Sequence, residues 1–134
     1  MSNKKIPKEE SEAYWRNHLN EKEYNVLREK GTESPFSGKF NLHSDNGTYV
    51  CGACHTPLFR SNQKFDSGCG WPSFDDAKED AVEFVLDKSH GMIRTEVVCS
   101  NCGGHLGHLF NDGPTETGQR YCINSISLDF REEI

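Results

Sequence analysis

The 134-residue chain is a somewhat polar sequence, 34% hydrophobic and 27% charged, with a formal net charge of −6. The negative charge opposes capture of a phosphate backbone and argues against nucleic-acid binding, and no apolar run approaches the roughly 20 residues that span a bilayer. Residues 1–10 are charged and lack the apolar core of a signal peptide, so we expect a cytoplasmic protein that does not bind membranes. Nothing in the sequence requires more than a monomer.

Residues 1–35 are expected to form a helical N-terminal extension. Within residues 8–31, scattered apolar residues among charges predict two short helices on the surface of the main body. Asn20 and Glu23 have the spacing of a capping box, and Gly31 is placed to end a helix.

From residue 36 to 134 the sequence changes to short β-type runs separated by turn residues. The turn signal Asp45-Asn46-Gly47 leads into the first of these runs. The predicted strands span residues 48–50, 57–60, 82–86 and 93–98, and the segment 119–130 is predicted to be β-rich. We therefore expect one domain over 1–134, whose core over 36–134 is mainly antiparallel β.

Four of the six cysteines form two C-x-x-C pairs, Cys51 with Cys54 and Cys99 with Cys102. Cytosolic thiols are kept reduced, so these cysteines indicate metal or redox chemistry rather than a disulfide framework. C-x-x-C is the spacing of a tetrahedral zinc site, and each pair follows a β-type run. Four thiolates leave no open position on the metal, so the site is predicted to be structural.

The spacing leaves alternatives open for these pairs. They could be thioredoxin-like redox motifs, although no βαβ pattern surrounds them, or they could hold an iron–sulfur centre. His55 or His105 could replace a thiolate ligand, but four thiolates make neither necessary.

Cys122 is the candidate nucleophile, because of its neighbours in the segment Arg120–Phe130. In an extended strand side chains alternate between faces, so Arg120, Cys122 and Asn124 share one face, which becomes apolar further along. A neighbouring positive charge favours the thiolate, the nucleophilic form of cysteine. The alternative is a cysteine buried as a small hydrophobe.

The glycine-flanked Cys69 and the neighbouring Trp71 form a second candidate segment. A thiol on a mobile, exposed loop suits a resolving cysteine, which attacks a sulfenic acid to form a disulfide; the alternative is a loop cysteine with no role. Trp71 offers a flat apolar surface to a ligand, although tryptophan is more often a core residue.

His105 and His108 lie in a glycine-rich stretch after the second C-x-x-C pair. Imidazoles are suited to proton delivery near neutral pH. The alternative is that these histidines are solvated loop residues or only support other groups.

Taken together, these segments closely resemble the B-type methionine sulfoxide reductases, which reduce methionine-R-sulfoxide. The resemblance runs from about residue 20 to 130, and the order of the motifs makes chance unlikely. The matching segments are Cys51–Cys54, Ser67–Phe74, Ser89–Met92, Cys99–Cys102, Gly104–His108, Asp112–Pro114 and Arg120–Ser125.

The resemblance implies a fold of two antiparallel β-sheets with the helices packed outside. It implies one structural zinc ion per chain, held by Cys51, Cys54, Cys99 and Cys102.

It further implies that the substrate is an oxidised protein or peptide containing methionine-R-sulfoxide. The Cys122 thiolate would attack the sulfoxide and become a sulfenic acid, Cys69 would convert that acid to a disulfide, and thioredoxin would restore the dithiol. His105 and His108 would supply the proton, Arg120 would stabilise the thiolate and Asn124 would orient the reacting groups. Trp71 would hold the S-methyl group, and the R preference follows from the resemblance alone.

Two other functions remain open on the residues themselves. A zinc-stapled binding module would explain the C-x-x-C pairs but not the surroundings of Cys122 and Cys69. Another thiol enzyme, such as a peroxide-reducing or disulfide-exchanging protein, would use the same two cysteines.

Overall fold

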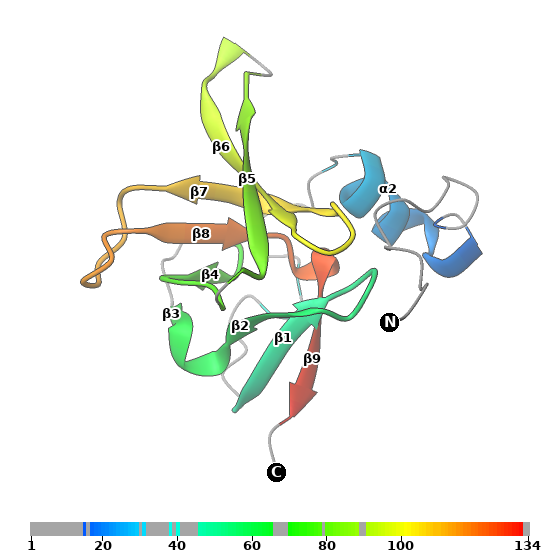
Figure 1. Ribbon diagram of the computed structural model, residues 1–134, viewed down its shortest axis with the longest axis horizontal. Coiled ribbons are helices and arrows are strands. Elements are labelled where there is room, and N and C mark those ends of the chain that lie inside the picture. The colour runs from blue at the N-terminus through cyan, green and yellow to red at the C-terminus, as the bar shows by residue number, and fades with distance from the viewer. Residues whose placement is uncertain are drawn as a thin grey trace, which may run out of the picture.

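Two antiparallel β-sheets form the body of the protein in a computed structural model, which describes residues 15, 17–29, 31, 38, 40, 46–65, 70–78, 80–88 and 91–132. The smaller sheet has the strand order β2-β1-β9 and the larger one the order β3-β4-β8-β7-β6-β5. In Figure 1 the smaller sheet lies below, β7 and β8 cross the middle, and the β5–β6 hairpin rises at the top. The predicted mainly β fold with two antiparallel sheets is confirmed.

The elements follow one another in a simple order. Helix α2 spans Glu21–Glu29, and short 3-10 turns lie at η2 (Ser61–Gln63) and η4 (Ser125–Ser127). The strands are β1 (Gly47–Cys51), β2 (Pro57–Arg60), β3 (Lys64–Phe65), β4 (Ser73–Phe74), β5 (Val82–Asp87), β6 (Arg94–Cys99), β7 (His105–Phe110), β8 (Arg120–Ile123) and β9 (Leu128–Glu132).

Helix α2 packs outside the sheets, against β7 and η4. The predicted capping box is present: the Glu23 backbone N–H donates to Asn20 Oδ1 at 2.8 Å, and the Asn20 N–H donates to Glu23 Oε1 at 3.0 Å. At the other end, the Gly31 N–H donates to the Asn25 carbonyl at 2.9 Å and closes the helix. Of the first predicted helix, only residues 15, 17 and 18 are described, and these are helical; Asp45 of the predicted turn lies outside the described residues.

Aromatic side chains fill the space between the two sheets. Phe59 of β2 stacks on Phe74 of β4 with ring centroids 4.2 Å apart, and Tyr49 of β1 meets Phe74 edge-on at 5.2 Å. Tyr49 also contacts Phe130 of β9 at 4.9 Å. Burial of these large rings holds the two sheets in a fixed relation.

The segment 119–130 does not form one strand, which corrects the prediction of a continuous alternation from Arg120 to Phe130. β8 ends at Ile123, η4 follows, and β9 then joins the other sheet. The break is held by hydrogen bonds that a straight strand could not make, because the Ser127 Oγ donates to the His105 carbonyl at 2.9 Å and the Gly52 N–H donates to the Ser127 carbonyl at 2.8 Å. The chain therefore crosses from one sheet to the other just after Cys122.

The other predicted strands are present, and the structure adds three that were not predicted, β3, β4 and β7. Among the described residues, no helix has the length and apolar character needed to cross a membrane.

Candidate functional site

Cys122 lies on β8, between β4 and β7 of the larger sheet. Its Cα pairs with that of Ser73 on β4 and with that of His108 on β7. Residues directly opposite one another in an antiparallel sheet project from the same face, so Cys122 and His108 share a face. Cys122 is half-buried, whereas Cys51, Cys99 and Cys102 are buried.

Both predicted histidines lie on β7, and a β-bulge brings their rings together. Val97 pairs with Gly107 and Val98 pairs with His105, so Leu106 is an extra residue on β7. In a regular strand residues 105 and 108 would point to opposite faces, but here the ring centroids of His105 and His108 are 5.5 Å apart, edge to face. The alternative of solvated loop histidines is wrong, because the side chains are only 3% and 14% exposed.

Each histidine is held by a buried carboxylate that the sequence did not identify. His105 Nδ1 lies 2.8 Å from Glu96 Oε2, and His108 Nε2 lies 2.8 Å from Asp87 Oδ2. Both carboxylate side chains are 5% exposed. Glu96 is also the Cα partner of His108 across β6 and β7, so Cys122, His108 and Glu96 form one row across three strands.

The sequence carried only a weak signal for these carboxylates. Glu96 is an acidic residue inside a run of β-branched residues, and Asp87 ends an apolar run. Neither neighbours a histidine in the sequence, and only the strand order brings the four side chains together.

Arg120 shares the strand with Cys122, but its guanidinium is anchored by Asp112. Arg120 Nε donates to Asp112 Oδ1 at 2.8 Å and an Nη donates to Oδ2 at 3.1 Å, while the guanidinium carbon lies 4.6 Å from the centre of the Phe110 ring. The hydrogen bond from Arg120 holds the pKa of the Asp112 carboxyl below its usual range. The predicted positive charge near Cys122 is thus fixed in place by a carboxylate and a ring.

Asn124 holds the β-bulge. Its backbone N–H donates to the Leu106 carbonyl at 2.9 Å, and its side-chain Nδ2 donates to the same carbonyl at 3.0 Å. Because Leu106 is the extra residue of β7, these two bonds stabilise the backbone conformation that brings the histidine rings together. Asn124 is 4% exposed.

Of the remaining two predicted residues, Trp71 lies at the β4 side of the row. Trp71 is half-buried and precedes Ser73, the partner of Cys122, by two residues. The Ser73 Oγ donates to the Trp71 carbonyl at 3.2 Å, which fixes the backbone at this point. Cys69 lies outside the described residues.

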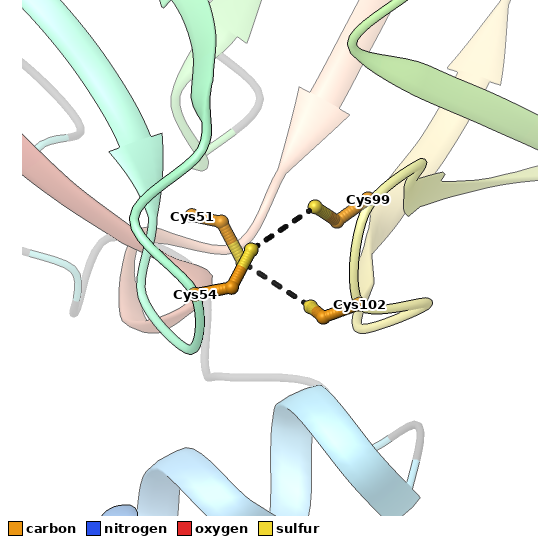
Figure 2. A group of neighbouring side chains, drawn as sticks. All are labelled: Cys51, Cys54, Cys99 and Cys102. Atoms are coloured by element: carbon orange, nitrogen blue, oxygen red, sulfur yellow. Dashed lines mark hydrogen bonds between the residues drawn. The ribbon is translucent and has the colours of Figure 1, made fainter. Parts of the chain in front are cut away.

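The four C-x-x-C cysteines converge from two turns, one after β1 and one after β6 (Figure 2). Their sulfur atoms all lie within 4.8 Å of one another, and they form a group that could hold a metal ion. Cys51 Sγ is 3.6 Å from Cys102 Sγ, and Cys54 Sγ is 3.6 Å from Cys99 Sγ. A tetrahedron with metal–sulfur bonds of about 2.3 Å has edges of about 3.8 Å, so the donor set fits a zinc ion. The group contains neither His55 nor His105.

Backbone N–H groups and the shifted pKa values of the thiols support the same metal site. The N–H groups of Ala53 and Gly104 donate to Cys51 Sγ and Cys102 Sγ, each at 3.4 Å. Hydrogen bonds from the neighbouring sulfurs, that of Cys102 above all, lower the pKa of the Cys54 thiol, while the Cys102 hydrogen bond, the other sulfurs and burial raise the pKa of the Cys51 thiol. A cation would replace the protons that the sulfurs otherwise share.

Comparison with known proteins decides between the functions that the sequence left open. A family model described as the SelR domain matches residues 19–132. The chain is 53% identical over 133 residues to a Variovorax paradoxus protein named peptide methionine sulfoxide reductase MsrB, covering 95% of this chain and 98% of that protein. A Pseudomonas fluorescens protein of the same name is 59% identical over 116 residues, 86% of this chain and 89% of that protein. The chain belongs to the MsrB family of peptide methionine sulfoxide reductases.

This membership confirms the predicted resemblance and the predicted enzyme class, a methionine sulfoxide reductase. The part of the chain that matches the family model includes every predicted site residue, from Cys51 to Asn124. In fold alone, the MsrB-family chain is also similar to the Mis18 'Yippee-like' domain, with a TM-score of 0.54 at 18% identity over 67% of this chain and 99% of that one.

Proposed function

We propose that this chain reduces methionine-R-sulfoxide in oxidised proteins and peptides, with Cys122 as the nucleophile. The observation that carries the proposal is the cross-strand pair of Cys122 and His108 on one face of the larger sheet. This pairing supports the proposal, because side chains directly opposite one another in a sheet have Cβ atoms about 4.5–5.5 Å apart, and a thiol with a nearby imidazole is the combination that a thiol reductase needs for nucleophilic attack and proton delivery.

In the first step, the Cys122 thiolate attacks the sulfoxide sulfur while His108, supported by His105, delivers a proton to the sulfoxide oxygen. The attack forms a bond between the two sulfur atoms. As the protonated oxygen passes to the Cys122 sulfur, this bond and the substrate's sulfur–oxygen bond break, which leaves a sulfenic acid on Cys122 and releases methionine. Cys122 is oxidised by two electrons and the substrate sulfur is reduced by two. Trp71 holds the S-methyl group, Arg120 stabilises the thiolate, and Asn124 orients the reacting groups through the bulge that it holds.

In the second step, the Cys69 thiol attacks the sulfenic acid, forms a Cys69–Cys122 disulfide and releases water. Sequence connectivity supports this pairing, because Cys69 precedes Ser73 by four residues and Ser73 is the Cα partner of Cys122. Four residues span at most about 14 Å. Thioredoxin then reduces the disulfide by thiol–disulfide exchange and becomes oxidised itself.

We further propose that Cys51, Cys54, Cys99 and Cys102 hold one structural zinc ion. The support is the sulfur geometry and the N–H groups directed at the sulfurs. A site closed by four thiolates stabilises the fold and takes no part in the reaction. Thiolate ligands and thioredoxin both need a reducing compartment, so we place the enzyme in the cytoplasm. We further propose that it acts as a monomer.

The test offers a peptide with methionine-R-sulfoxide or methionine-S-sulfoxide to the enzyme, with thioredoxin or with dithiothreitol. We expect turnover of the R epimer only; no turnover of either epimer would refute the proposal. Cys122→Ser should abolish activity. Cys69→Ser should form one methionine per enzyme but lose thioredoxin-supported turnover, and an unimpaired Cys69→Ser would remove the resolving role.

A further inference from the structure

Asp87 lies at the end of the edge strand β5 and is 5% exposed. It is the Cα partner of Arg94 at the start of β6, so the two residues close the β5–β6 hairpin. The Asp87 Oδ2 accepts from His108 Nε2 at 2.8 Å and lies 3.5 Å from an Arg94 Nη. One carboxylate oxygen thus ties the hairpin to the histidine beside Cys122.

This contact distinguishes the two nitrogens of the His108 ring. An ionised carboxylate only accepts hydrogen bonds, so Nε2 must carry the hydrogen that Asp87 receives. Burial makes this bond costly to lose, because a carboxylate removed from water needs its partners. Arg94, a quarter exposed, supplies a positive charge 3.5 Å from the same carboxylate oxygen, from the paired position on β6.

We propose that Asp87 is a positioning residue for the reductase reaction, which makes His108 deliver its proton from Nδ1. In the charged ring both nitrogens carry hydrogen. The Nδ1–H bond breaks as the oxygen–hydrogen bond forms on the sulfoxide, and the Nε2–H stays on Asp87, so the ring is left as the neutral Nε2–H tautomer. The inference rests on the proposed function, since it assigns a role within that reaction.

A carboxylate in this role also fixes the direction of the ring. Without Asp87 the imidazole could rotate about its Cβ–Cγ bond and present either nitrogen. Among the described residues, the charged or titratable groups on the same face of the sheet are Asp87 and the exposed Glu83 from β5, Arg94 and Glu96 from β6, His105 from β7, and Arg120 and Cys122 from β8. Arg28 of α2 is directed instead to the Cys102 carbonyl, at 2.9 Å.

The first test needs no activity. Long-range ¹H–¹⁵N NMR spectra of the imidazoles report which ring nitrogen carries the hydrogen. We expect neutral His108 of the native protein to be the Nε2–H tautomer, and Asp87→Asn, whose amide can donate as well as accept, to populate both tautomers. An Nδ1–H tautomer in the native protein would overturn the proposal even if the variant failed to fold.

The second test is a double-mutant cycle in the reductase assay. Asp87→Asn should lower kcat by about 10- to 100-fold, part of the contribution of a general acid, and leave KM within about threefold. In a His108→Asn background, Asp87→Asn should cause no further loss, because it acts through that ring. Glu83→Gln, an exposed change on the same strand, serves as the control and should keep kcat within twofold.

An equal loss in both backgrounds, or an unchanged kcat in Asp87→Asn, would refute the positioning role. Failure of the proposed function can also be distinguished from failure of the proposed role of Asp87. If the native enzyme reduces no sulfoxide, the proposed function is wrong, whereas the NMR tautomer still decides whether Asp87 fixes the ring.

Discussion

Gly107→Ala tests whether the close approach of β7 and β8 sets the distance between His108 and Cys122. Gly107 pairs with Ile123, next to the pair of His108 and Cys122. A Cβ added at Gly107 would overlap the backbone carbonyl oxygen of Cys122. Because the clash is with backbone rather than with a flexible side chain, the two strands must separate.

Overpacking of this kind costs about 1–3 kcal/mol. For a chain of this length, each kcal/mol lowers Tm by roughly 3–5 °C, so we expect Tm to fall by roughly 3–15 °C. The loss in reaction rate should be larger than the loss in stability suggests. A displacement of about 1 Å between reacting groups can cost about 100-fold in rate, and the strands move where the nucleophile and the proton donor face each other.

Calorimetry and the sulfoxide assay below the variant's Tm measure the two effects. Gly118→Ala is the matched control: it lies in the connection between β7 and β8, its φ is +69°, and nothing lies within 4 Å of an added Cβ. It should lose about 1–2 kcal/mol from backbone strain and keep its kcat. A native kcat in Gly107→Ala, or a parallel loss of kcat in Gly118→Ala, would show that strand spacing does not set the rate.

Three further predictions address the metal cluster, the buried carboxylates and the Arg120–Asp112 pair. Cys99→Ser should abolish zinc binding, measured by elemental analysis, and lower Tm by more than 10 °C, since structural zinc contributes about 10 kcal/mol or more to folding; stoichiometric zinc in this variant would contradict the four-thiolate site. Glu96→Ala should cost about 3–5 kcal/mol in urea unfolding because it leaves a buried histidine without its partner, whereas Glu116→Ala, on the surface, should change stability by less than about 0.5 kcal/mol. Since the Arg120 guanidinium lowers the pKa of Asp112, the ion pair should persist as pH falls to the ordinary aspartate value of about 3.9 and be lost only below it. Carboxyl ¹³C NMR should record this, with a midpoint that moves up in Arg120→Gln; an unmoved midpoint would mean that the pair does not exist in solution.

Most of the chemistry of the site follows from local patterns in the sequence. The C-x-x-C spacing indicates the metal ligands, because two cysteines three residues apart can bind one ion from a single turn. The capping box at Asn20 and the strands at 48–50 and 93–98 were predicted for the same reason, since both depend on residues that are neighbours along the chain.

Predictions that extended a local pattern too far were wrong. The alternation from Arg120 was continued to Phe130, but the chain leaves the larger sheet at η4, where a serine hydroxyl bonds a carbonyl of β7. The alternative that His105 and His108 are solvated loop residues, in a glycine-rich stretch, is wrong for a related reason. Gly107 is there because β8 leaves no room for a side chain, and a glycine required by close strand packing looks in sequence like a glycine of a turn.

The sequence by itself determined which side chains can react and which can bind metal, because those properties belong to single residues and short spacings. Only the tertiary structure decided how the histidines are held. Glu96 reaches His105 from the neighbouring strand β6, and Asp87 reaches His108 across β6 from β5. A one-residue bulge at Leu106 turns both rings to meet each other. Strand order and register depend on contacts between residues far apart in the chain, so they fix the partners of a residue whose own chemistry is already clear.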